Sequence, residues 1–163
     1  MAPEKPPRED RGPFWAVALS TVLGLGFTPK MPGTVGAAAG FFLFVPAFFL
    51  SRDAAFLLPL VELLAVFILA AFSIPPVLRA TGQSDPSYIV IDEVAGVLCA
   101  LCIAPPEFVW SLLAFVLFRT LDIFKPFPVD KLERLRGAWG VVADDVGAGI
   151  LAGLLTLIVR RLF

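Results

Sequence analysis

Apolar residues in this chain occur in runs that are separated by short polar or proline-rich segments. Two of these runs, Thr34–Leu50 and Ala54–Ser73, approach the ~17–20 residues that a helix needs to cross a hydrocarbon core. Ser51-Arg52-Asp53 separates them by a tight turn, so they predict a membrane hairpin. Ile74-Pro75-Pro76 predicts the end of the second helix, because proline cannot donate a helical hydrogen bond. The earlier run Phe14–Phe27 is too short to span and predicts an interfacial or partly embedded helix.

The remaining apolar runs are shorter. Val94–Ala104 and Phe108–Phe118 flank the segment Pro105-Pro106-Glu107. At ~1.5 Å per residue, the first of them reaches only about half of the hydrocarbon core. The two runs are therefore either the legs of a re-entrant hairpin or one kinked span. The last run, Val146–Val159, ends at Arg160-Arg161, a pair of cations typical of a membrane interface.

No segment sustains the alternation of a strand, so the fold class predicted is all-α, a multi-pass membrane helical bundle with short re-entrant or kinked helices. The composition agrees with this prediction. Hydrophobic residues make up 58% of the chain and charged residues 17%, whereas soluble domains are about 25% charged. The mean hydropathy is +0.88. We expect residues 1–13, which are rich in proline and mixed in charge, to form a disordered tail, and residues 14–163 to form a single membrane-embedded domain.

Charge and rare residue types exclude several functions. The net charge of −1 argues against a nucleic-acid partner, which would require a basic face. Histidine is absent, so acid–base chemistry must use carboxylates, Lys, Tyr, Cys or a metal-bound water. Cys99 and Cys102 have C-x-x-C spacing, but zinc would lack two ligands. Because thiols in apolar surroundings are inert, we expect both to be helix-packing residues.

Four polar islands interrupt the apolar runs, and the first is a Gly/Pro loop that precedes a helix predicted to open at Thr34. Free backbone N–H groups at such a helix start bind anions. Lys30 adds a cation, and Gly33, Thr34 and Gly36 form the candidate phosphate-binding turn. The alternative is that Thr34 is an ordinary N-cap after a turn.

The second and fourth islands are the acidic pairs Asp92-Glu93 and Asp144-Asp145. They lie in the similar sequences Ile89–Val94 and Val141–Val146, each directly before an apolar run. Helix capping needs only one acid, and adjacent carboxylates repel one another. Acids at a membrane are costly, and clustered oxygen ligands without His or thiolate suit Mg²⁺. We therefore favour metal binding over capping.

The third island lies between Phe118 and Pro128. Arg119, Asp122 and Lys125 recur every third residue, so they share one face of a helix that Pro126 is predicted to end. One interpretation is a small ladder of salt bridges along that helix. The other is a further carboxylate for a metal, flanked by two cations for a phosphate.

These islands together resemble the phosphatidylglycerophosphatase A family. The motifs that carry the resemblance are Thr28-Pro-x-x-Pro-Gly-Thr-x-Gly36, Asp85-x-x-x-Ile-Val-x-Asp-Glu93, Phe118-Arg-x-x-Asp-x-x-Lys-Pro-x-Pro128 and Gly140-Val-x-x-Asp-Asp145-x-x-Ala-Gly149. They occur in the family's order and with similar spacing over roughly residues 14–158. Ala138 departs from the family, which tends to repeat glycine there, but this change touches no charged group.

The resemblance implies a bacterial inner-membrane enzyme that removes the terminal phosphate of phosphatidylglycerol phosphate in a Mg²⁺-dependent step. Five carboxylates are the expected metal ligands: Asp92, Glu93, Asp122, Asp144 and Asp145. Arg119 and Lys125 are expected to bind phosphoryl oxygens, and with the five acids they make up the expected catalytic set. Lys30 and the Gly33–Gly36 turn are expected to hold the inner phosphodiester or assist the leaving group.

Three alternatives stay open at this point. An aspartyl nucleophile could replace activated water, although the Asp-x-Asp pattern that such enzymes use is absent. A CDP-alcohol phosphotransferase would also place acids and a metal at the membrane surface, but its longer signature does not fit here. A small transporter would pair its acids with cations inside the bundle and would require no metal.

The prediction with the most structural content concerns topology. If residues 94–118 form a re-entrant hairpin, all four polar islands lie on one side of the membrane. The positive-inside rule makes that side the cytoplasm, because Lys and Arg gather in the segments next to the islands. These cations are Lys5, Arg8, Arg11, Arg79, Lys131, Arg134 and Arg136. A single crossing helix would instead separate Asp92 from Asp122 by the ~30 Å core. Glu107, at the hairpin tip, would have to reach water or a partner.

Overall fold

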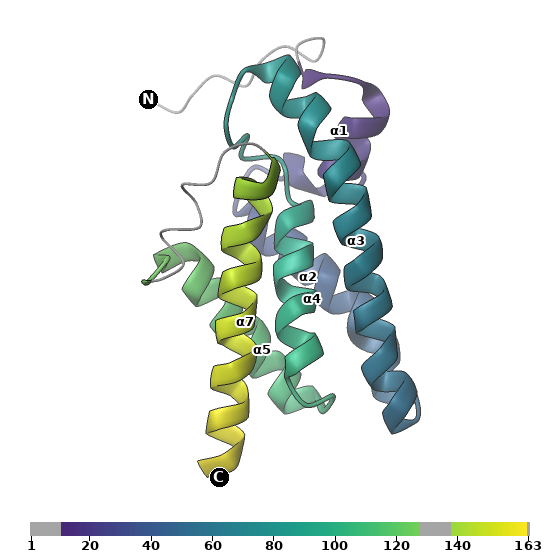
Figure 1. The fold of residues 1–163 in the computed structure, drawn as a ribbon, viewed down its shortest axis with the longest axis vertical. Helices are drawn as coiled ribbons and strands as arrows, with labels where there is room; N and C mark the ends of the chain where they lie inside the picture. The colour runs from purple at the N-terminus through teal and green to yellow at the C-terminus, as the bar shows by residue number, and fades with distance from the viewer. Residues whose placement is uncertain (1–10, 128–137, 163) are drawn as a thin grey trace.

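A computed structural model of the chain describes residues 11–127 and 138–162, and within these ranges all regular structure is helical. The expected tail therefore lies almost wholly outside the described residues. The elements are α1 (Phe14–Ser20), η2 (Leu25–Phe27), α2 (Pro32–Phe44), η3 (Val45–Phe49), α3 (Arg52–Thr81), α4 (Ile91–Ile103), α5 (Phe108–Phe124) and α7 (Ala138–Leu162). Figure 1 shows them as an elongated bundle with α3 and α7 running along most of its length.

Within the described residues, three segments are long and apolar enough to cross a membrane: Pro32–Phe49, Asp53–Thr81 and Gly140–Leu162. Large apolar side chains point outward along the second of them. Phe56, Val61 and Phe72 are 61%, 62% and 68% exposed. In water such a surface would be an aggregation site, whereas in a bilayer it is the expected lipid contact. The prediction of an all-α membrane bundle is confirmed.

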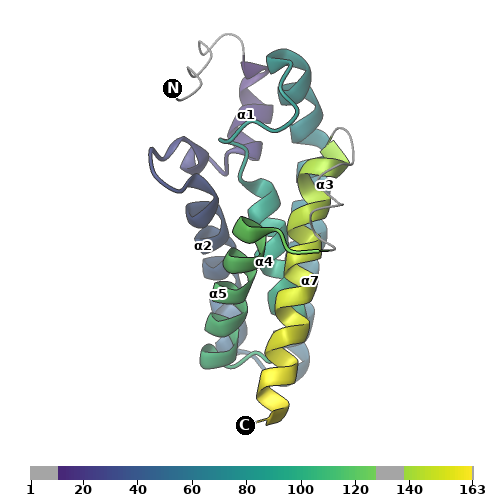
Figure 2. The same cartoon turned by 90° about the vertical axis from the view of Figure 1, so that its left-hand side faces the viewer.

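The two short apolar runs form a hairpin and not one crossing helix. α4 runs away from the polar islands, and α5 returns toward them after the turn at Pro105 and Pro106 (Figures 1 and 2). α4 is the centre of the bundle, since α2, α3, α5 and α7 all pack against it. Most of its side chains are buried as a result.

Glycines allow the closest of these helix contacts. α4 and α7 both begin at the end of the bundle that holds the polar islands. A Cβ placed on Gly149 of α7 would lie 2.2 Å from the carbonyl oxygen of Gly96 on α4. A Cβ on Gly96 would lie 2.5 Å from the Phe118 ring and 2.8 Å from the Asp145 carbonyl oxygen. Small residues at such positions let two membrane helices approach backbone to backbone.

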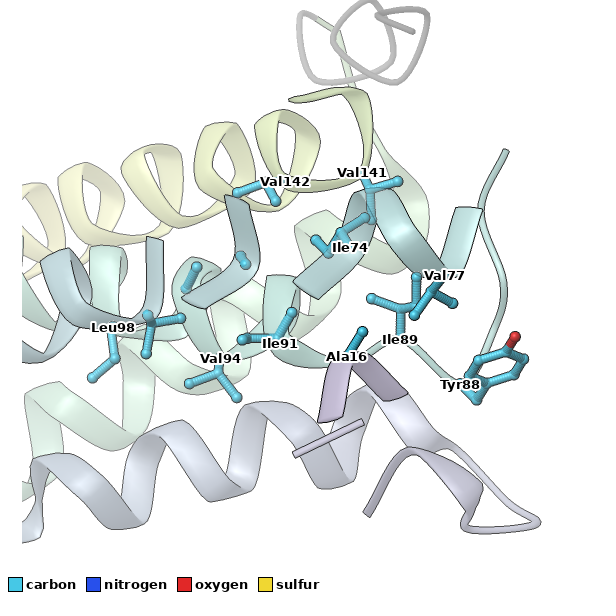
Figure 3. Packing of buried hydrophobic residues seen from close by; sticks show 13 residues of the cluster. Ala16, Ile74, Val77, Tyr88, Ile89, Ile91, Val94, Leu98, Val141 and Val142 are labelled. Carbon is cyan, nitrogen blue, oxygen red and sulfur yellow. The ribbon is translucent and has the colours of Figure 1, made fainter. Parts of the chain in front are cut away.

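The predicted break at Ile74-Pro75-Pro76 is wrong, because α3 continues through both prolines to Thr81. Tertiary packing holds this last part of the helix in place. Ile74 and Val77 are fully buried, and Figure 3 shows them among Ala16 of α1, Ile89 and Val141 of α7. The apolar contacts compensate for the backbone hydrogen bonds that the prolines remove, as in many membrane helices.

Three other helix boundaries differ from the prediction. α2 begins at Pro32 and not at Thr34, because proline is well suited to the first helical position. α5 ends at Phe124, which leaves Lys125 as a left-handed cap (φ 43°), since the residue before Pro126 avoids the helical region. α7 begins at Ala138, so its acidic pair lies inside the helix and not ahead of it.

The N-terminal apolar run is only partly helical. α1 ends at Ser20, and a turn with Val22 and Leu23 at positive φ leads to η2. At the opposite end of the bundle, the start of α3, the α4–α5 turn and the end of α7 lie together (Figure 1). There Glu107 accepts a hydrogen bond from Arg160 at 2.6 Å, so the acid at the hairpin tip has a partner.

Candidate active site

The four polar islands meet in one pocket of about 370 Å³. The pocket is lined by the first turn of α2, the start of α4, the end of α5 and the first two turns of α7. The loop that precedes α4 completes the lining. Nine of the predicted site residues are among the lining: Gly33, Thr34, Asp92, Glu93, Arg119, Asp122, Lys125, Asp144 and Asp145. The hairpin of α4 and α5 explains this convergence, because it returns Asp122 to the end at which Asp92 lies.

Three carboxylates form the centre of the pocket. One oxygen from each of Asp92, Glu93 and Asp145 lies within 4.8 Å of the others. The Gly96–Gly149 contact accounts for this proximity, because each glycine follows an acid by one helical turn: Gly96 follows Asp92, and Gly149 follows Asp145. Gly33 completes the arrangement, since a Cβ there would lie 2.1 Å from Oε1 of Glu93.

Two ion pairs border this carboxylate triad. Arg119 donates from Nη1 to Oδ2 of Asp122 at 2.5 Å, within the last two turns of α5. Lys125 donates from Nζ to Oδ2 of Asp144 at 2.6 Å, which links the end of α5 to α7. Asp122 and Asp144 are thus held by cations, whereas the predicted set of five acids treated them as equal to the other three. The predicted three-residue ladder is also incomplete, because Lys125 lies outside the helix and bonds to α7.

Several buried polar atoms around the pocket have no hydrogen-bond partner. They are Thr34 Oγ1, Glu93 Oε2, Arg119 Nε and Asp144 Oδ1. A buried polar atom without a partner costs roughly 1–3 kcal/mol, so a native protein rarely leaves several in one place. Both donors and acceptors are present among them. The pocket therefore has the polar groups to take up a cation and an anion together.

The electrostatics of the triad favour a bound cation. Two of its members, Asp92 and Glu93, lie in the first turn of α4, which is not one of the candidate spanning helices. Burial raises the pKa of Asp92 well above its usual range, and the carboxylates of Glu93 and Asp145 raise it further. Burial raises the pKa of Glu93 to about 7, although the hydrogen bond with Asp92 and the nearby Arg119 guanidinium oppose that shift. A divalent cation would remove the mutual repulsion that these shifts express.

Comparison with known proteins assigns the chain to a family. The family described as phosphatidylglycerophosphatase A matches residues 18–160. The chain belongs to the phosphatidylglycerophosphatase A family. It is therefore a phosphatase, as the resemblance implied.

Named relatives cover nearly the whole chain. Phosphatidylglycerophosphatase A of Haemophilus influenzae is 33% identical over 87% of this chain and 86% of its own length. The Escherichia coli protein of the same name is 32% identical over 86% of this chain and 81% of its own length. A Bacteroides thetaiotaomicron protein, named provisionally as a phosphatidylinositol-3-phosphatase, is 35% identical over 92% of this chain and 96% of its own length. No solved structure matches the chain.

Capping does not explain the acids of this phosphatidylglycerophosphatase A family member. The start of α4 has no side-chain cap hydrogen bond, and the backbone N–H that donates to Asp92 is that of its neighbour Glu93, at 3.1 Å, which is not a cap of the helix end. Asp144 and Asp145 lie in the second turn of α7, where no free backbone N–H remains to be capped. Thr34 is likewise not an N-cap, since Met31 occupies that position with φ 53°.

Two predicted residues lie outside the pocket, and two others were missed. Lys30 is exposed, and Gly36 packs against Val90, so neither lines the cavity. Asp85 and Ser87 do line it, from the loop before α4. Asp85 opens the second motif of the phosphatidylglycerophosphatase A pattern, and that position was the available signal. No sequence rule could place the loop against α2 and α5.

The two cysteines are free thiols on α4, away from the pocket lining. Cys99 is buried, and a Cβ on Gly149 of α7 would lie 3.2 Å from the Cys99 Cβ. Their placement agrees with a packing role between helices.

Proposed function

We propose that the protein hydrolyses the terminal phosphomonoester of phosphatidylglycerol phosphate, with Mg²⁺, to give phosphatidylglycerol and inorganic phosphate. The observation that carries the proposal is the carboxylate triad of Asp92, Glu93 and Asp145 beside Arg119 and Lys125, in one pocket of a family member. In the balanced reaction, water adds across the phosphorus–oxygen bond, and the glycerol headgroup leaves as an alcohol.

The residues fit a hard divalent cation. Asp92, Glu93 and Asp145 would hold it, because their oxygens converge and Oε2 of Glu93 is buried without a partner. Oδ1 of Asp144 is a further oxygen donor at the edge of the triad. When bound, Mg²⁺ supplies Lewis-acid polarisation of a phosphoryl oxygen and lowers the pKa of water. The chain has no His and only two Cys, which excludes the usual zinc ligand sets.

The phosphate is held by donors that the fold has already oriented. Arg119 donates one hydrogen bond from Nη1 to Asp122, and this bond orients the guanidinium group. Its Nε–H has no partner in the protein and can donate to an anion. The first turn of α2 adds the hydroxyl of Thr34 and the backbone N–H groups of Gly33 and Thr34. Asp144 positions the ammonium of Lys125 in the same way. These groups neutralise the charge that develops on the phosphoryl oxygens during transfer.

The direct test is phosphate release by the purified protein from phosphatidylglycerol phosphate in detergent micelles, with Mg²⁺ and with EDTA. We expect turnover with Mg²⁺ and none with the chelator, and full turnover in EDTA would contradict the metal role. Asp92→Asn and Asp145→Asn should each lower kcat by about a hundredfold or more, because the amide cannot supply the ligand charge. Asp53→Asn is the matched control, since Asp53 is an exposed acid at the opposite end of the bundle.

The same assay settles which lipid the enzyme prefers. One relative is named for an inositol lipid, so phosphatidylinositol 3-phosphate belongs beside phosphatidylglycerol phosphate in the assay. We expect the higher kcat/KM for phosphatidylglycerol phosphate, in keeping with the family. A higher value for the inositol lipid would replace the proposed substrate but would leave the chemistry of the site unchanged.

We further propose that the protein lies in the bacterial inner membrane with its pocket on the cytoplasmic side. Support comes from the cations at the pocket end, which include Arg11, Lys30 and Arg79 in addition to the two in the site. The other predicted cations of this side, Lys5, Arg8, Lys131, Arg134 and Arg136, lie outside the described residues.

Cysteine labelling in intact cells tests this topology. In a Cys99→Ala, Cys102→Ala background, Gln83→Cys should resist an impermeant thiol reagent, because Gln83 is exposed on the loop at the pocket end. Ser51→Cys, on the exposed turn at the other end, should react and serves as the matched control. Leu135→Cys should resist as well, although Leu135 lies outside the described residues. Reaction at Gln83 with protection at Ser51 would reverse the orientation.

A further inference from the structure

One wall of the active-site pocket changes from polar to apolar at the surface of the bundle. Two of its lining residues, Met31 and Ile123, are large, apolar and exposed: Met31 is 63% exposed and Ile123 is 59% exposed. Met31 directly precedes α2, and Ile123 lies in the last turn of α5. Both belong to the same cavity as Arg119 and Glu93.

α2 and α5 lie side by side and run in opposite directions (Figure 2). Away from the pocket, aromatic rings of α2 and of η3, which directly follows it, pack against rings of α5. The Phe41 and Phe115 rings are 5.7 Å apart, and the Phe48 and Phe108 rings are 6.0 Å apart. In each pair the two residue numbers add up to 156, because in antiparallel segments one number rises as the other falls. Continued toward the pocket, this register places the first turn of α2 opposite the last turn of α5.

At that level α2 carries Gly33, whose lack of a side chain leaves room for two groups of the site. A Cβ on Gly33 would lie 2.1 Å from Oε1 of Glu93 and 3.0 Å from Nη2 of Arg119. The cavity that holds these two groups is also lined by Met31 and Ile123, whose exposed side chains border its opening at the surface. Met31 directly precedes the candidate span Pro32–Phe49, so this opening lies at the end of a segment that would enter the membrane.

We propose that this opening, bordered by Met31 and Ile123, is a lateral portal that receives the glycerol and acyl region of the lipid substrate while its phosphate reaches Arg119. The proposal rests on the proposed function and adds the recognition of the apolar part of the substrate. An amphiphile with a phosphate at one end and hydrocarbon at the other matches a cavity whose polarity changes in the same sense. Met31 and Ile123 are then specificity-determining residues that contact acyl chains and take no part in the chemistry.

The test compares two substrates that share one headgroup. The first is phosphatidylglycerol phosphate in detergent micelles, and the second is its deacylated, water-soluble counterpart. Ile123→Gln and Met31→Gln should each raise KM for the lipid by roughly five- to tenfold, because each variant loses an apolar contact with the acyl region. KM for the deacylated headgroup and kcat for both substrates should stay within about twofold of the wild-type values.

Controls separate this inference from folding and from the proposed function. Leu25→Gln, at the same end of the bundle, replaces a 41% exposed apolar residue that lies outside the pocket, and it should change neither KM. Ile123→Leu should keep the wild-type KM for the lipid. An equal rise in KM for both substrates, or an unchanged KM for the lipid, would overturn the portal. Absence of phosphate release from either substrate by the wild-type protein would instead overturn the proposed function.

Discussion

The contact between Gly96 and Gly149 offers the most demanding test of how the fold builds the site. A Cβ at residue 149 would lie 2.2 Å from the Gly96 carbonyl oxygen, whereas ordinary contact begins near 3.4 Å. Gly149→Ala must therefore separate α4 from α7 by about 1.2 Å, the difference between these two distances. The obstacle is a backbone atom, which cannot turn aside. Overpacking of this kind costs about 1–3 kcal/mol of unfolding free energy.

A loss of function should accompany the loss of stability. The separation occurs one helical turn from Asp92 and Asp145, so the carboxylate triad should widen with it. A misplacement of about 1 Å in a catalytic site can lower the rate by about a hundredfold. We therefore expect Gly149→Ala to weaken Mg²⁺ binding, measured by calorimetry on the folded protein in detergent, and to lower kcat by a similar factor.

A second glycine of α7 provides the comparison. A Cβ on Gly153 would meet the Ile103 Cβ at 2.6 Å and the Ala100 carbonyl oxygen at 2.9 Å, two turns away from Asp145. Gly153→Ala should lower stability in the same range but should preserve most of the Mg²⁺ affinity. Wild-type Mg²⁺ affinity and kcat in Gly149→Ala would refute the reasoning that this contact sets the geometry of the triad.

Three further outcomes follow from the same structure. Mg²⁺ affinity should rise as the pH rises through about 7, because the Glu93 carboxyl must lose its proton before a cation binds. Calorimetric titrations at several pH values check this, and an affinity that does not change with pH would contradict it. The Cys99→Ala, Cys102→Ala double variant should keep most of its activity in the phosphate-release assay, and a folded but inactive variant would disprove the packing role. Glu107→Gln should lower the unfolding free energy by less than about 1 kcal/mol in detergent, because Glu107 and Arg160 are both exposed; a larger loss would show a buried pair.

The sequence was sufficient to predict the helices but not every residue at which they begin and end. Long apolar runs predict spanning segments because the transfer of a long apolar helix from water into a bilayer is favourable. Pro75 and Pro76 misled the prediction, since their effect depends on the burial of Ile74 and Val77 against other helices. Residues far apart in the chain provide that packing, and no local pattern records it.

The site was predictable as a set of residues but not as an arrangement. The number and clustering of acids in an apolar chain marked Asp92, Glu93 and Asp145 without any structure. The ion pair that separates Asp144 from the triad involves Lys125, which is the left-handed cap of α5 and lies outside the helix that its spacing predicted. Asp85 reaches the pocket through a loop, and loop paths follow no periodicity.

The late position of α7 in the chain has a consequence for biosynthesis. Asp122 and Arg119 leave the ribosome before Asp144 and Asp145, so a nascent chain that has inserted α2 to α5 still lacks the third carboxylate of the triad. The hydrogen bond between Lys125 and Asp144 likewise forms only when α7 is in place. If the triad binds a cation as proposed, the protein gains this capacity only after α7 has inserted, and therefore later than membrane insertion of the preceding helices.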